Sequence, residues 1–562
     1  MLRSDFREER GPPFRGAYYR GRPMHRRLVF SFLSAVVLSG VITHGSKAAQ
    51  KSCESLGQLQ LPDTKITLAE SVAAGAFTPP PGPNPAPGMP ANYKDVPAFC
   101  RVVAEISPTA DSNIKIEVWL PAGGWNGKFQ GQGNGGFAGV IDYRGLGAAI
   151  KRGYATAGTD TGHAGFDAAW ALGHPEKVID FGYRGLHEMT VKAKALTEAF
   201  YGDHPQRSYF AACSDGGREA LMEAQRFPQD YEGILAGAPA NFWTHLLVEA
   251  IWVTEATTLD PASYIPAGKI NAVAAAVVAA CNAQNGVPDG ILNDPRQCNF
   301  DPATMLCKEA DSDSCLTAPQ VAALKKIYAG PHDSAGHQLF PAYVPGAEEG
   351  GGGWSLWITG SAPGRSLMAF FGTQFFTNMV YEQAGWDYKT FNIDQATKLA
   401  DSKTARALNA IDPNLKPFMA RGGKLILYHG WGDAAIPAPN TIDYYNSVVG
   451  KMGRHDTDSF VRLFMVPGMQ HCGGGPGANS FGQGADYAPF DPEHNIYTAL
   501  EQWVEKGEAP PKIIATKYVN DTDPSKGVKM TRPLCSYPQV PKYKGSGDTN
   551  DAANFVCVEG NR

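Results

Sequence analysis

The stretch Cys213-Ser214-Asp215-Gly216-Gly217 combines residue types that could do chemistry. Apolar residues before it predict the end of a buried strand, and the residues after it predict a helix. Small residues at such a strand-to-helix turn permit a sharp bend, which exposes the serine hydroxyl and leaves backbone N–H groups able to hold an oxyanion. The stretch alone is equally typical of a serine that caps a helix in a tight turn.

A second pair of neighbours favours the catalytic interpretation. Cys213 precedes Ser214, and Cys472 follows His471. A Ser–His hydrogen bond needs heavy atoms about 3 Å apart, and a disulfide needs Cα atoms within roughly 7 Å. Contact between the serine and the histidine would therefore bring the two cysteines into bonding range. We expect one disulfide to hold a nucleophile and its base together.

Two later segments supply an acid and place the histidine. The apolar run 424–428 predicts a strand that is followed on a loop by Asp433, and the run 461–466 predicts a strand that leads to His471. The order Ser214, Asp433, His471 is the order of the catalytic triad in α/β-hydrolases. In a triad the histidine takes the serine proton, while the acid orients the imidazole and stabilises its charged form.

Two other histidines lie near acids in the sequence. His429 is a rival base, but it lies at the end of a strand and has no paired cysteine beside it. Asp160 and His163 precede Ser214, against the chain order of the hydrolase triad. We therefore expect Asp160 and His163 to form structural hydrogen bonds.

A glycine-rich loop, residues 131–139, follows a predicted strand at 127–130. It lacks the lysine and the following helix of a phosphate-binding loop. In an α/β-hydrolase this is the position of the loop that donates a second N–H to the oxyanion. A flexible surface hairpin is the other interpretation.

The chain has 562 residues, which is too long for one compact core and indicates two domains or a large insertion. Strand patterns lie at 99–106, 114–120, 154–159 and 233–240, and a helix pattern lies at 185–201. This order predicts an α/β fold, an α/β-hydrolase core formed by residues 49–242 and 422–562. A large lid domain, residues 243–421, is inserted between the sixth and seventh core strands.

The inserted segment contains four of the ten cysteines and a cluster of aromatic residues. The aromatic residues are Trp354, Trp357, Phe370, Phe371, Phe375, Phe376 and Tyr381. Because the segment would lie over the strand ends, it would cover the active site. Aromatic residues in such a segment form a small core more often than they contact substrate, although a lid of this composition suits a flat aromatic substrate.

Composition and the N-terminal residues limit which binding partners and which cellular compartment we expect. Hydrophobic residues make up 43% of the chain and charged residues 19%, and the net charge of −5 gives no reason to expect nucleic acid or an anionic membrane as partner. Residues 1–48 predict a signal peptide, with an arginine-rich start, an apolar run at 28–42 and a small-residue cleavage site. The run is too short to span a membrane. We expect a secreted or periplasmic protein that has no membrane contact once processed.

Ten cysteines fit an oxidising compartment and permit five disulfides. The catalytic argument favours one pair, and short spacing favours two more. Adjacency suggests the last two, although ten cysteines allow many other pairings. The expected pairs are Cys213–Cys472, Cys281–Cys298, Cys307–Cys315, Cys53–Cys100 and Cys535–Cys557.

One loop of the inserted segment has the oxygen-rich composition of a hard-cation site. Asn282, Asn285 and Asp289 carry oxygen-bearing side chains, and the carbonyls of Val287 and Ile291 could complete a structural Ca²⁺ site. Only Asp289 brings formal charge, so we expect weak affinity. A disulfide-clamped turn without metal is the other interpretation. No organic cofactor is expected.

These motifs together resemble the tannase and feruloyl esterase family, which also contains mono(2-hydroxyethyl) terephthalate hydrolase. The likeness is carried by residues 213–217, 428–433 and 467–472, and the paired cysteines make it specific. It extends over most of the chain after residue 53. Members of the family split esters of aromatic acids: gallate, ferulate and related hydroxycinnamates, or terephthalate monoesters.

The resemblance implies a role for each site residue. Ser214, Asp433 and His471 would form the triad, and the N–H of Asp215 together with that of one glycine among residues 133–136, for which we take Gly135, would form the oxyanion hole. The family's lid usually binds Ca²⁺ through the oxygen-rich loop, with Asp at two positions where this chain has Asn.

We therefore expect a secreted serine esterase that hydrolyses esters of hydroxycinnamic, gallic or related aromatic carboxylic acids through an acyl-enzyme. Its partner would be a small aromatic ester. Within the enzymes, the alternatives are a terephthalate-monoester hydrolase and a general carboxylesterase. The alternative from a different class is a non-catalytic protein that binds a phenolic ligand on the same scaffold.

Overall fold

The computed structural model describes residues 51–80, 93–282, 286–346, 348–484 and 487–560. The chain divides into two compact units, residues 1–47 and 48–562. The predicted signal peptide lies outside the described residues, so the description concerns the second unit alone. Within the described ranges, no helix is both long and apolar enough to cross a membrane.

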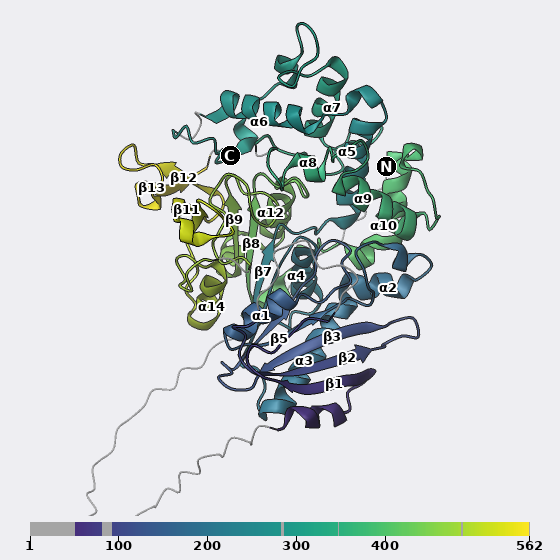
Figure 1. Cartoon of the computed structure of the whole chain (residues 1–562), viewed down its shortest axis with the longest axis vertical. Coiled ribbons are helices and arrows are strands. Elements are labelled where there is room, and N and C mark those ends of the chain that lie inside the picture. The colour runs from purple at the N-terminus through teal and green to yellow at the C-terminus, as the bar shows by residue number, and fades with distance from the viewer. Residues whose placement is uncertain (1–50, 81–92, 283–285, 347, 485–486, 561–562) are drawn as a thin grey trace, which may run out of the picture. The chain divides into compact units, whose positions relative to one another are not determined.

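A nine-stranded, mostly parallel sheet forms the framework of this unit (Figure 1). Its strands in spatial order are β1 (Thr64–Val72), β2 (Phe99–Ile106), β3 (Ile114–Pro121), β5 (Ala155–Thr159), β4 (Lys128–Gln132), β6 (Arg207–Cys213), β7 (Gly233–Gly237), β8 (Lys424–Gly430) and β9 (Val461–Val466). The pairs from β1 to β5 are antiparallel, and those from β5 to β9 are parallel. Every residue of β5 and β7 is buried, as expected where helices cover both faces of parallel strands.

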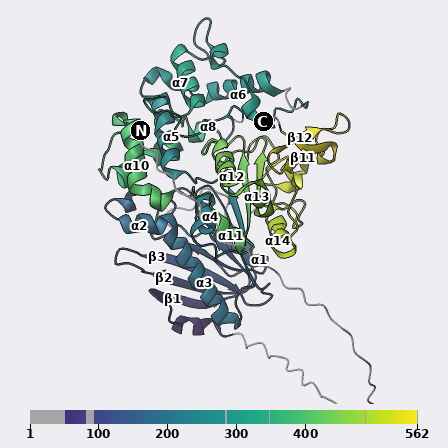
Figure 2. The ribbon, with the colours of Figure 1, turned by 180° about the vertical axis from the view of Figure 1, so that it is seen from behind.

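Helices pack on both faces of the sheet. On one face lie α3 (Gly185–Tyr201), α4 (Asp215–Arg226) and α12 (Pro439–Met452), and on the other lie α1 (Tyr143–Lys151) and α14 (Ile496–Lys506). The two faces alternate along each strand, since successive side chains of a strand point to opposite sides. Figure 2 shows α3 lying across the antiparallel end of the sheet. The helix predicted at 185–201 is confirmed.

Buried residues of the segment between β7 and β8, among them Leu247, Ile251, Val273, Leu324 and Phe375, form a hydrophobic cluster that also takes in Phe137, Phe181 and residues 434–436 of the rest of the unit. Its helices are α5 (Trp243–Thr258), α6 (Ala267–Cys281), α7 (Ala318–Ala329), α8 (Trp354–Trp357), α9 (Leu367–Phe375), α10 (Ile393–Leu408) and α11 (Lys416–Ala420). Figure 1 shows α5 to α9 gathered at one end of the unit. The insertion follows the seventh strand rather than the sixth, because β1, which the sequence patterns above did not include, adds a strand at the sheet edge.

The remaining elements lie beside the core. They are α2 (Pro175–Ile179), α13 (Arg454–Phe460) and two small antiparallel sheets, one of β10 (Lys512–Tyr518) and β11 (Val528–Cys535), the other of β12 (Gln539–Tyr543) and β13 (Phe555–Glu559). Five disulfides link all ten cysteines, in the expected pairs. They are Cys53–Cys100, Cys213–Cys472, Cys281–Cys298, Cys307–Cys315 and Cys535–Cys557.

Candidate active site

The serine occupies a strained turn between β6 and α4. Ser214 has φ 70° and ψ −125°, a conformation that residues with a side chain rarely adopt. Its N–H donates to the carbonyl of Gly237 (3.0 Å), so the turn is fixed to the neighbouring strand. A Cβ added at Gly216 would lie 2.5 Å from the Cβ of Ala212 and 2.7 Å from the carbonyl oxygen of Asn134. The turn therefore needs glycine at that position, as the nucleophile-elbow interpretation requires.

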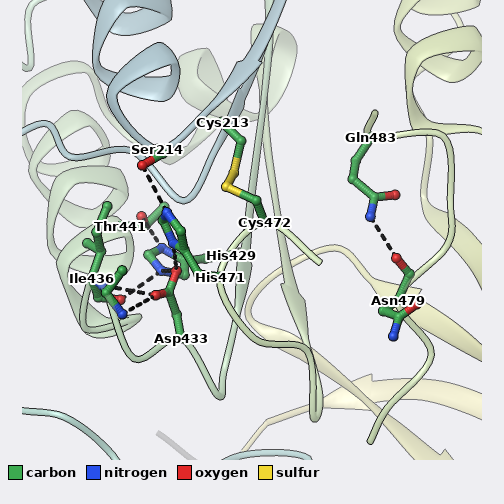
Figure 3. Close-up of a disulfide and its surroundings, with 11 residues drawn as sticks. Cys213, Ser214, His429, Asp433, Ile436, Thr441, His471, Cys472, Asn479 and Gln483 are labelled. Carbon is green, nitrogen blue, oxygen red and sulfur yellow. Dashed lines mark hydrogen bonds and ion pairs between the residues drawn. A yellow bond between two sulfur atoms is a disulfide. The ribbon is translucent and has the colours of Figure 1, made fainter. Parts of the chain in front are cut away.

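Ser214, His471 and Asp433 form one hydrogen-bonded chain (Figure 3). The Ser214 Oγ lies 2.8 Å from His471 Nε2, and His471 Nδ1 lies 2.7 Å from Asp433 Oδ2. A carboxylate only accepts, so Nδ1 carries the proton and Nε2 is left to accept the serine proton. This is the tautomer that a general base requires.

Asp433 is fully buried and surrounded by donors. Its Oδ1 accepts the N–H groups of Ala435 (2.8 Å) and Ile436 (2.9 Å), and its Oδ2 accepts from His471 and His429. Burial alone would raise the pKa of this carboxyl. The two histidines and their hydrogen bonds outweigh burial and hold the pKa of Asp433 well below its usual range. Asp433 is therefore ionised at neutral pH and can accept the hydrogen bond from His471 Nδ1.

His429 forms a hydrogen bond with Asp433 and not with Ser214. Its Nε2 donates to Asp433 Oδ2 (3.1 Å) and to the carbonyl of Ile436 (3.0 Å), and its Nδ1 lies 2.7 Å from Thr441 Oγ1. Because the carbonyl can only accept, the Nε2 carries the proton and Nδ1 accepts from the threonine. Both ring nitrogens are thus engaged away from Ser214 (Figure 3).

The disulfide between Cys213 and Cys472 joins the two chain segments that carry the nucleophile and its base, with Cα atoms 6.0 Å apart. Each cysteine is the sequence neighbour of a residue in the Ser–His pair (Figure 3). The covalent link therefore limits how far the two catalytic loops can separate.

The glycine-rich loop is fixed on several sides. The carbonyl of Asn134 accepts the N–H of Gly216 (3.0 Å), and the Asn134 amide donates to the carbonyls of Ala138, Val140 and Thr159 at 2.8 to 3.1 Å. The interpretation as a flexible hairpin is therefore wrong.

The N–H groups assigned to the oxyanion hole remain available. Among the described residues, none of the hydrogen bonds uses the N–H of Gly135 or of Asp215. Asp215 is the first residue of α4, where the N–H has no acceptor within the helix. Two N–H groups from different elements are thus free to hold a developing oxyanion.

The Asp160–His163 pair supports the glycine-rich loop and takes no part in the triad. Asp160 accepts the N–H groups of Lys115 and Gly162 at 2.9 Å, and His163 Nε2 donates to the carbonyl of Phe137 (2.7 Å). Burial raises the pKa of Asp160 to about 7 and lowers the pKa of His163 to about 4. The expected structural role of this pair is consistent with these contacts.

Aromatic rings surround the approach to the triad. The Trp357 ring lies 5.0 Å from the His471 ring and stacks on Phe371 at 6.2 Å. Phe371 also contacts Phe166, which is 37% exposed, and a Cβ added at Gly136 would lie 2.9 Å from the Phe371 ring. Of the predicted aromatic cluster, Trp357 and Phe371 therefore reach the catalytic loops.

The other members of that cluster stay in the inserted segment. Trp354, Phe375 and Phe376 are buried in its core, while Phe370 and Tyr381 pack against it.

The described side-chain oxygens of the oxygen-rich loop have partners within the chain. The Asn282 Oδ1 accepts the N–H of Gly290 (2.8 Å), and Asp289 accepts the N–H of Ile291 (3.0 Å) and a guanidinium N–H of Arg532 (2.8 Å). The described side-chain oxygens of the loop are thus engaged as acceptors, and the one formal charge is paired with a cation of the chain itself.

Other predicted ligands of that loop add no charge. The carbonyl of Val287 accepts the N–H of Asp289 (2.9 Å), and Asn285 lies outside the described residues. Calcium binding stays a prediction here, and no catalytic step depends on it.

Comparisons relate the chain to known esterases. The profile of a family described as "Tannase and feruloyl esterase" matches residues 100–558. An uncharacterized esterase of Xanthomonas campestris pv. campestris is 43% identical over 567 residues, covering 95% of both chains. A probable feruloyl esterase B-2 of Aspergillus terreus is 32% identical over 532 residues, covering 92% of this chain and 98% of its own. The solved feruloyl esterase B of Aspergillus oryzae is 30% identical, with a TM-score of 0.82, covering 90% of this chain and 99% of its own. The predicted fold class, an α/β-hydrolase core with a large insertion, is confirmed.

Proposed function

Because the chain belongs to the tannase and feruloyl esterase family and is a carboxylic ester hydrolase, we propose that it is a serine esterase for esters of aromatic carboxylic acids. The observation that carries the mechanism is the contact of 2.8 Å between Ser214 Oγ and the Nε2 of His471, whose Nδ1 is held by Asp433. A non-catalytic binding protein would not need this tautomer or this alignment.

In the acylation step, Ser214 Oγ attacks the ester carbonyl carbon while His471 Nε2 takes the hydroxyl proton. Asp433 stabilises the imidazolium through its bond to Nδ1. The carbonyl oxygen becomes an oxyanion and is held by the N–H groups of Gly135 and Asp215. When the tetrahedral intermediate collapses, the C–O bond to the alcohol breaks and His471 gives its proton to the leaving oxygen.

In the deacylation step, water takes the place of the alcohol. His471 Nε2 removes a proton from this water, which attacks the acyl carbon, and the same two N–H groups hold the second oxyanion. Collapse returns the proton to Ser214 Oγ and releases the carboxylic acid. The residues end as they began, so no external redox partner or cofactor is required by this sequence of steps.

The aromatic preference rests on the side chains beside the catalytic loops. The Trp357 ring lies beside His471, and Phe371 and the partly exposed Phe166 lie beside Gly136. A planar aromatic acyl group would bury its faces against such rings, where stacked or edge-to-face pairs contribute about 0.5–1.5 kcal/mol beyond their buried area.

Export from the cytoplasm is part of the proposal. Five disulfides favour an oxidising compartment, and residues 1–48 have the composition of a signal peptide. We infer a secreted or periplasmic enzyme.

Replacement of Ser214 tests the mechanism. Ser214→Ala should lower kcat/KM for p-nitrophenyl acetate by at least about 10⁴-fold with an unchanged melting temperature, while the exposed Ser361→Ala should match the wild type. A serine-directed phosphonate should label the wild type and not Ser214→Ala. Activity of Ser214→Ala near wild type would refute the proposal, and absence of both turnover and labelling in the wild type would favour a binding protein.

A substrate panel tests the aromatic preference. We would compare kcat/KM for methyl ferulate, methyl gallate, a terephthalate monoester and methyl butyrate. Preference for one of the first two supports the proposed substrate class. Preference for the terephthalate monoester would move the assignment to that hydrolase, and equal rates on all four would indicate a general carboxylesterase.

A further inference from the structure

Helix α4 carries a buried acid that faces the glycine-rich loop. Glu219 lies just over one turn beyond Ser214 on this helix and is only 1% exposed. Its Oε2 accepts the backbone N–H of Asn134 at 2.9 Å. Its Oε1 is buried and has no hydrogen-bond partner among the described residues. Burial of a carboxyl group is unfavourable unless hydrogen bonds compensate. The single hydrogen bond from Asn134 therefore suggests that Glu219 has a role beyond packing.

Asn134 immediately precedes Gly135, whose N–H the proposed function assigns to the oxyanion hole. Its carbonyl accepts the N–H of Gly216 (3.0 Å), and its side-chain amide donates to three carbonyls of the same region. Its own N–H has Glu219 as acceptor. A buried N–H must find an acceptor, and the helix that carries Ser214 supplies it.

Close packing leaves the glycine-rich loop little freedom to shift. A Cβ added at Gly133 would lie 2.6 Å from Glu219 Oε2 and 2.8 Å from the Cβ of Ala212. The carboxyl group therefore lies against Gly133 as well as against the Asn134 N–H. Helix α4 holds the loop at two points, Gly216 and Glu219, and the same helix begins with the N–H of Asp215.

We propose that Glu219 is a positioning residue for ester hydrolysis, which acts through Asn134 to keep the Gly135 N–H in register with the Asp215 N–H. The inference rests on the oxyanion hole of the proposed function. Glu219 does not touch the substrate. It fixes the distance between two donors that come from different elements, and oxyanion stabilisation depends on that distance.

The position of the acceptor matters more than its charge. Burial, together with the neighbouring Asp215, raises the pKa of Glu219 to about 8, although Arg218 opposes the shift. A neutral carboxyl at pH 7 still accepts the Asn134 N–H through one oxygen. Glutamine offers the same oxygen at the same length and should replace Glu219, whereas aspartate keeps the carboxyl group but withdraws it by one methylene.

The experiment compares Glu219→Gln, Glu219→Asp and Glu219→Met with Glu223→Met, a change one turn further along α4 at an equally buried position. We would measure kcat and KM with p-nitrophenyl acetate and the inhibition constant of phenylboronic acid, which forms a tetrahedral adduct with a nucleophilic serine. Glu219→Met should lower kcat about 10- to 100-fold, less than the about 10²–10³-fold loss of an oxyanion donor itself, with KM within about 3-fold.

The same variant should bind phenylboronic acid more weakly by a factor similar to its loss of kcat. Glu219→Gln should stay within about 3-fold of wild type in both measurements, Glu219→Asp should fall between Gln and Met, and Glu223→Met should keep its kcat per folded molecule.

Unchanged kcat and boronate affinity in Glu219→Met, with only a lower melting temperature, would overturn the inference, as would Glu219→Asp outperforming Glu219→Gln. If Glu219→Met does not fold, the order of Gln and Asp decides. Ser214→Ala, measured alongside, separates the two proposals. An active Ser214→Ala overturns the mechanism itself, whereas an inactive Ser214→Ala beside a fully active Glu219→Met overturns only the role of Glu219.

Discussion

Two polar regions of this molecule each contain a disulfide, but they differ in which hydrogen-bonding groups have no partner. At the triad, the Cys213–Cys472 bond joins the nucleophile turn to the histidine loop. The side chains there form a chain that ends at Ser214, and the N–H groups of Gly135 and Asp215 have no acceptor among the described residues.

In the Cys281–Cys298 loop of the inserted segment, the described side-chain oxygens are paired with groups of the chain. Asn282 accepts a backbone N–H of the loop, and Asp289 is paired with Arg532 from β11. The described side-chain oxygens of this loop have partners within the chain, whereas the N–H groups of Gly135 and Asp215 beside the triad have none among the described residues. What distinguishes the triad region is that buried partners orient its side chains, while these two N–H groups have no acceptor among the described residues.

The largest effect should follow from Asp433→Asn. An amide can no longer serve as a purely accepting partner for His471 Nδ1–H, so the imidazole can adopt the wrong tautomer, and kcat/KM should fall about 10⁴-fold. The measurement is hydrolysis of p-nitrophenyl acetate at pH 7, with the exposed Asp412→Asn as control. A loss of less than about 10-fold would show that the acid is not part of the triad.

Removal of each disulfide tests the comparison directly. The double variant Cys213→Ser, Cys472→Ser releases the link between the Ser and His loops, and kcat should fall by up to about 100-fold, because a shift of about 1 Å can cost this much. The matched variant Cys281→Ser, Cys298→Ser should lower the melting temperature and keep kcat within about 3-fold, since that loop contributes no reacting atom. Equal losses of kcat in both variants would contradict the distinction.

The sequence alone predicted the triad and the parallel strands because their signals are local. The Cys-Ser-Asp-Gly-Gly turn and the apolar run before Asp433 can each be recognised within one segment, and the cysteines beside Ser214 and His471 show that the two segments belong together. Strand β2 has the predicted bounds. Strand β1 was missed because it lies at the sheet edge, where its residues are half-buried or exposed, so the apolar pattern of an inner strand is absent.

Buried charge is the part that the sequence could not predict. In α4, Arg218, Glu219 and Glu223 are all buried, although helical patterns assume that charged residues face water. The pairing of Asp289 with Arg532 joins residues 243 positions apart, and nothing local marks either of them. Such contacts depend on how the elements pack, which a pattern along one segment does not contain.

His429 offers a prediction of intermediate size. His429→Leu removes one donor to Asp433 and should lower kcat about 10-fold, in line with a lost hydrogen bond to a charged group of about 1.5 kcal/mol. His429→Gln keeps an N–H near the position of Nε2 and should recover most of the activity. Full activity of His429→Leu would show that the other three donors suffice.

The effect of His429→Leu on the melting temperature should also depend on pH. The depressed pKa of Asp433 contributes stability that is fully present above the ordinary aspartate value of about 3.9 and is lost as pH falls toward the folded-state pKa. Loss of the His429 donor raises that pKa and removes part of this stability. The difference in melting temperature between wild type and His429→Leu should therefore be constant near pH 6 and shrink below about pH 4.

The smallest effect concerns calcium in the inserted segment. Arg532 supplies positive charge to Asp289 at 2.8 Å and also lies 4.5 Å from the Phe555 ring, so the loop has a cation of its own. A chelator should change the melting temperature of the wild type by less than about 1 °C, because weakly bound metal adds little stability. Arg532→Met should lower the melting temperature by about 1–3 °C. It leaves the Asp289 carboxylate unpaired, so added Ca²⁺ should stabilise this variant more than the wild type. A loss of several degrees on chelation of the wild type would show instead that a bound metal, rather than Arg532, balances the charge of this loop.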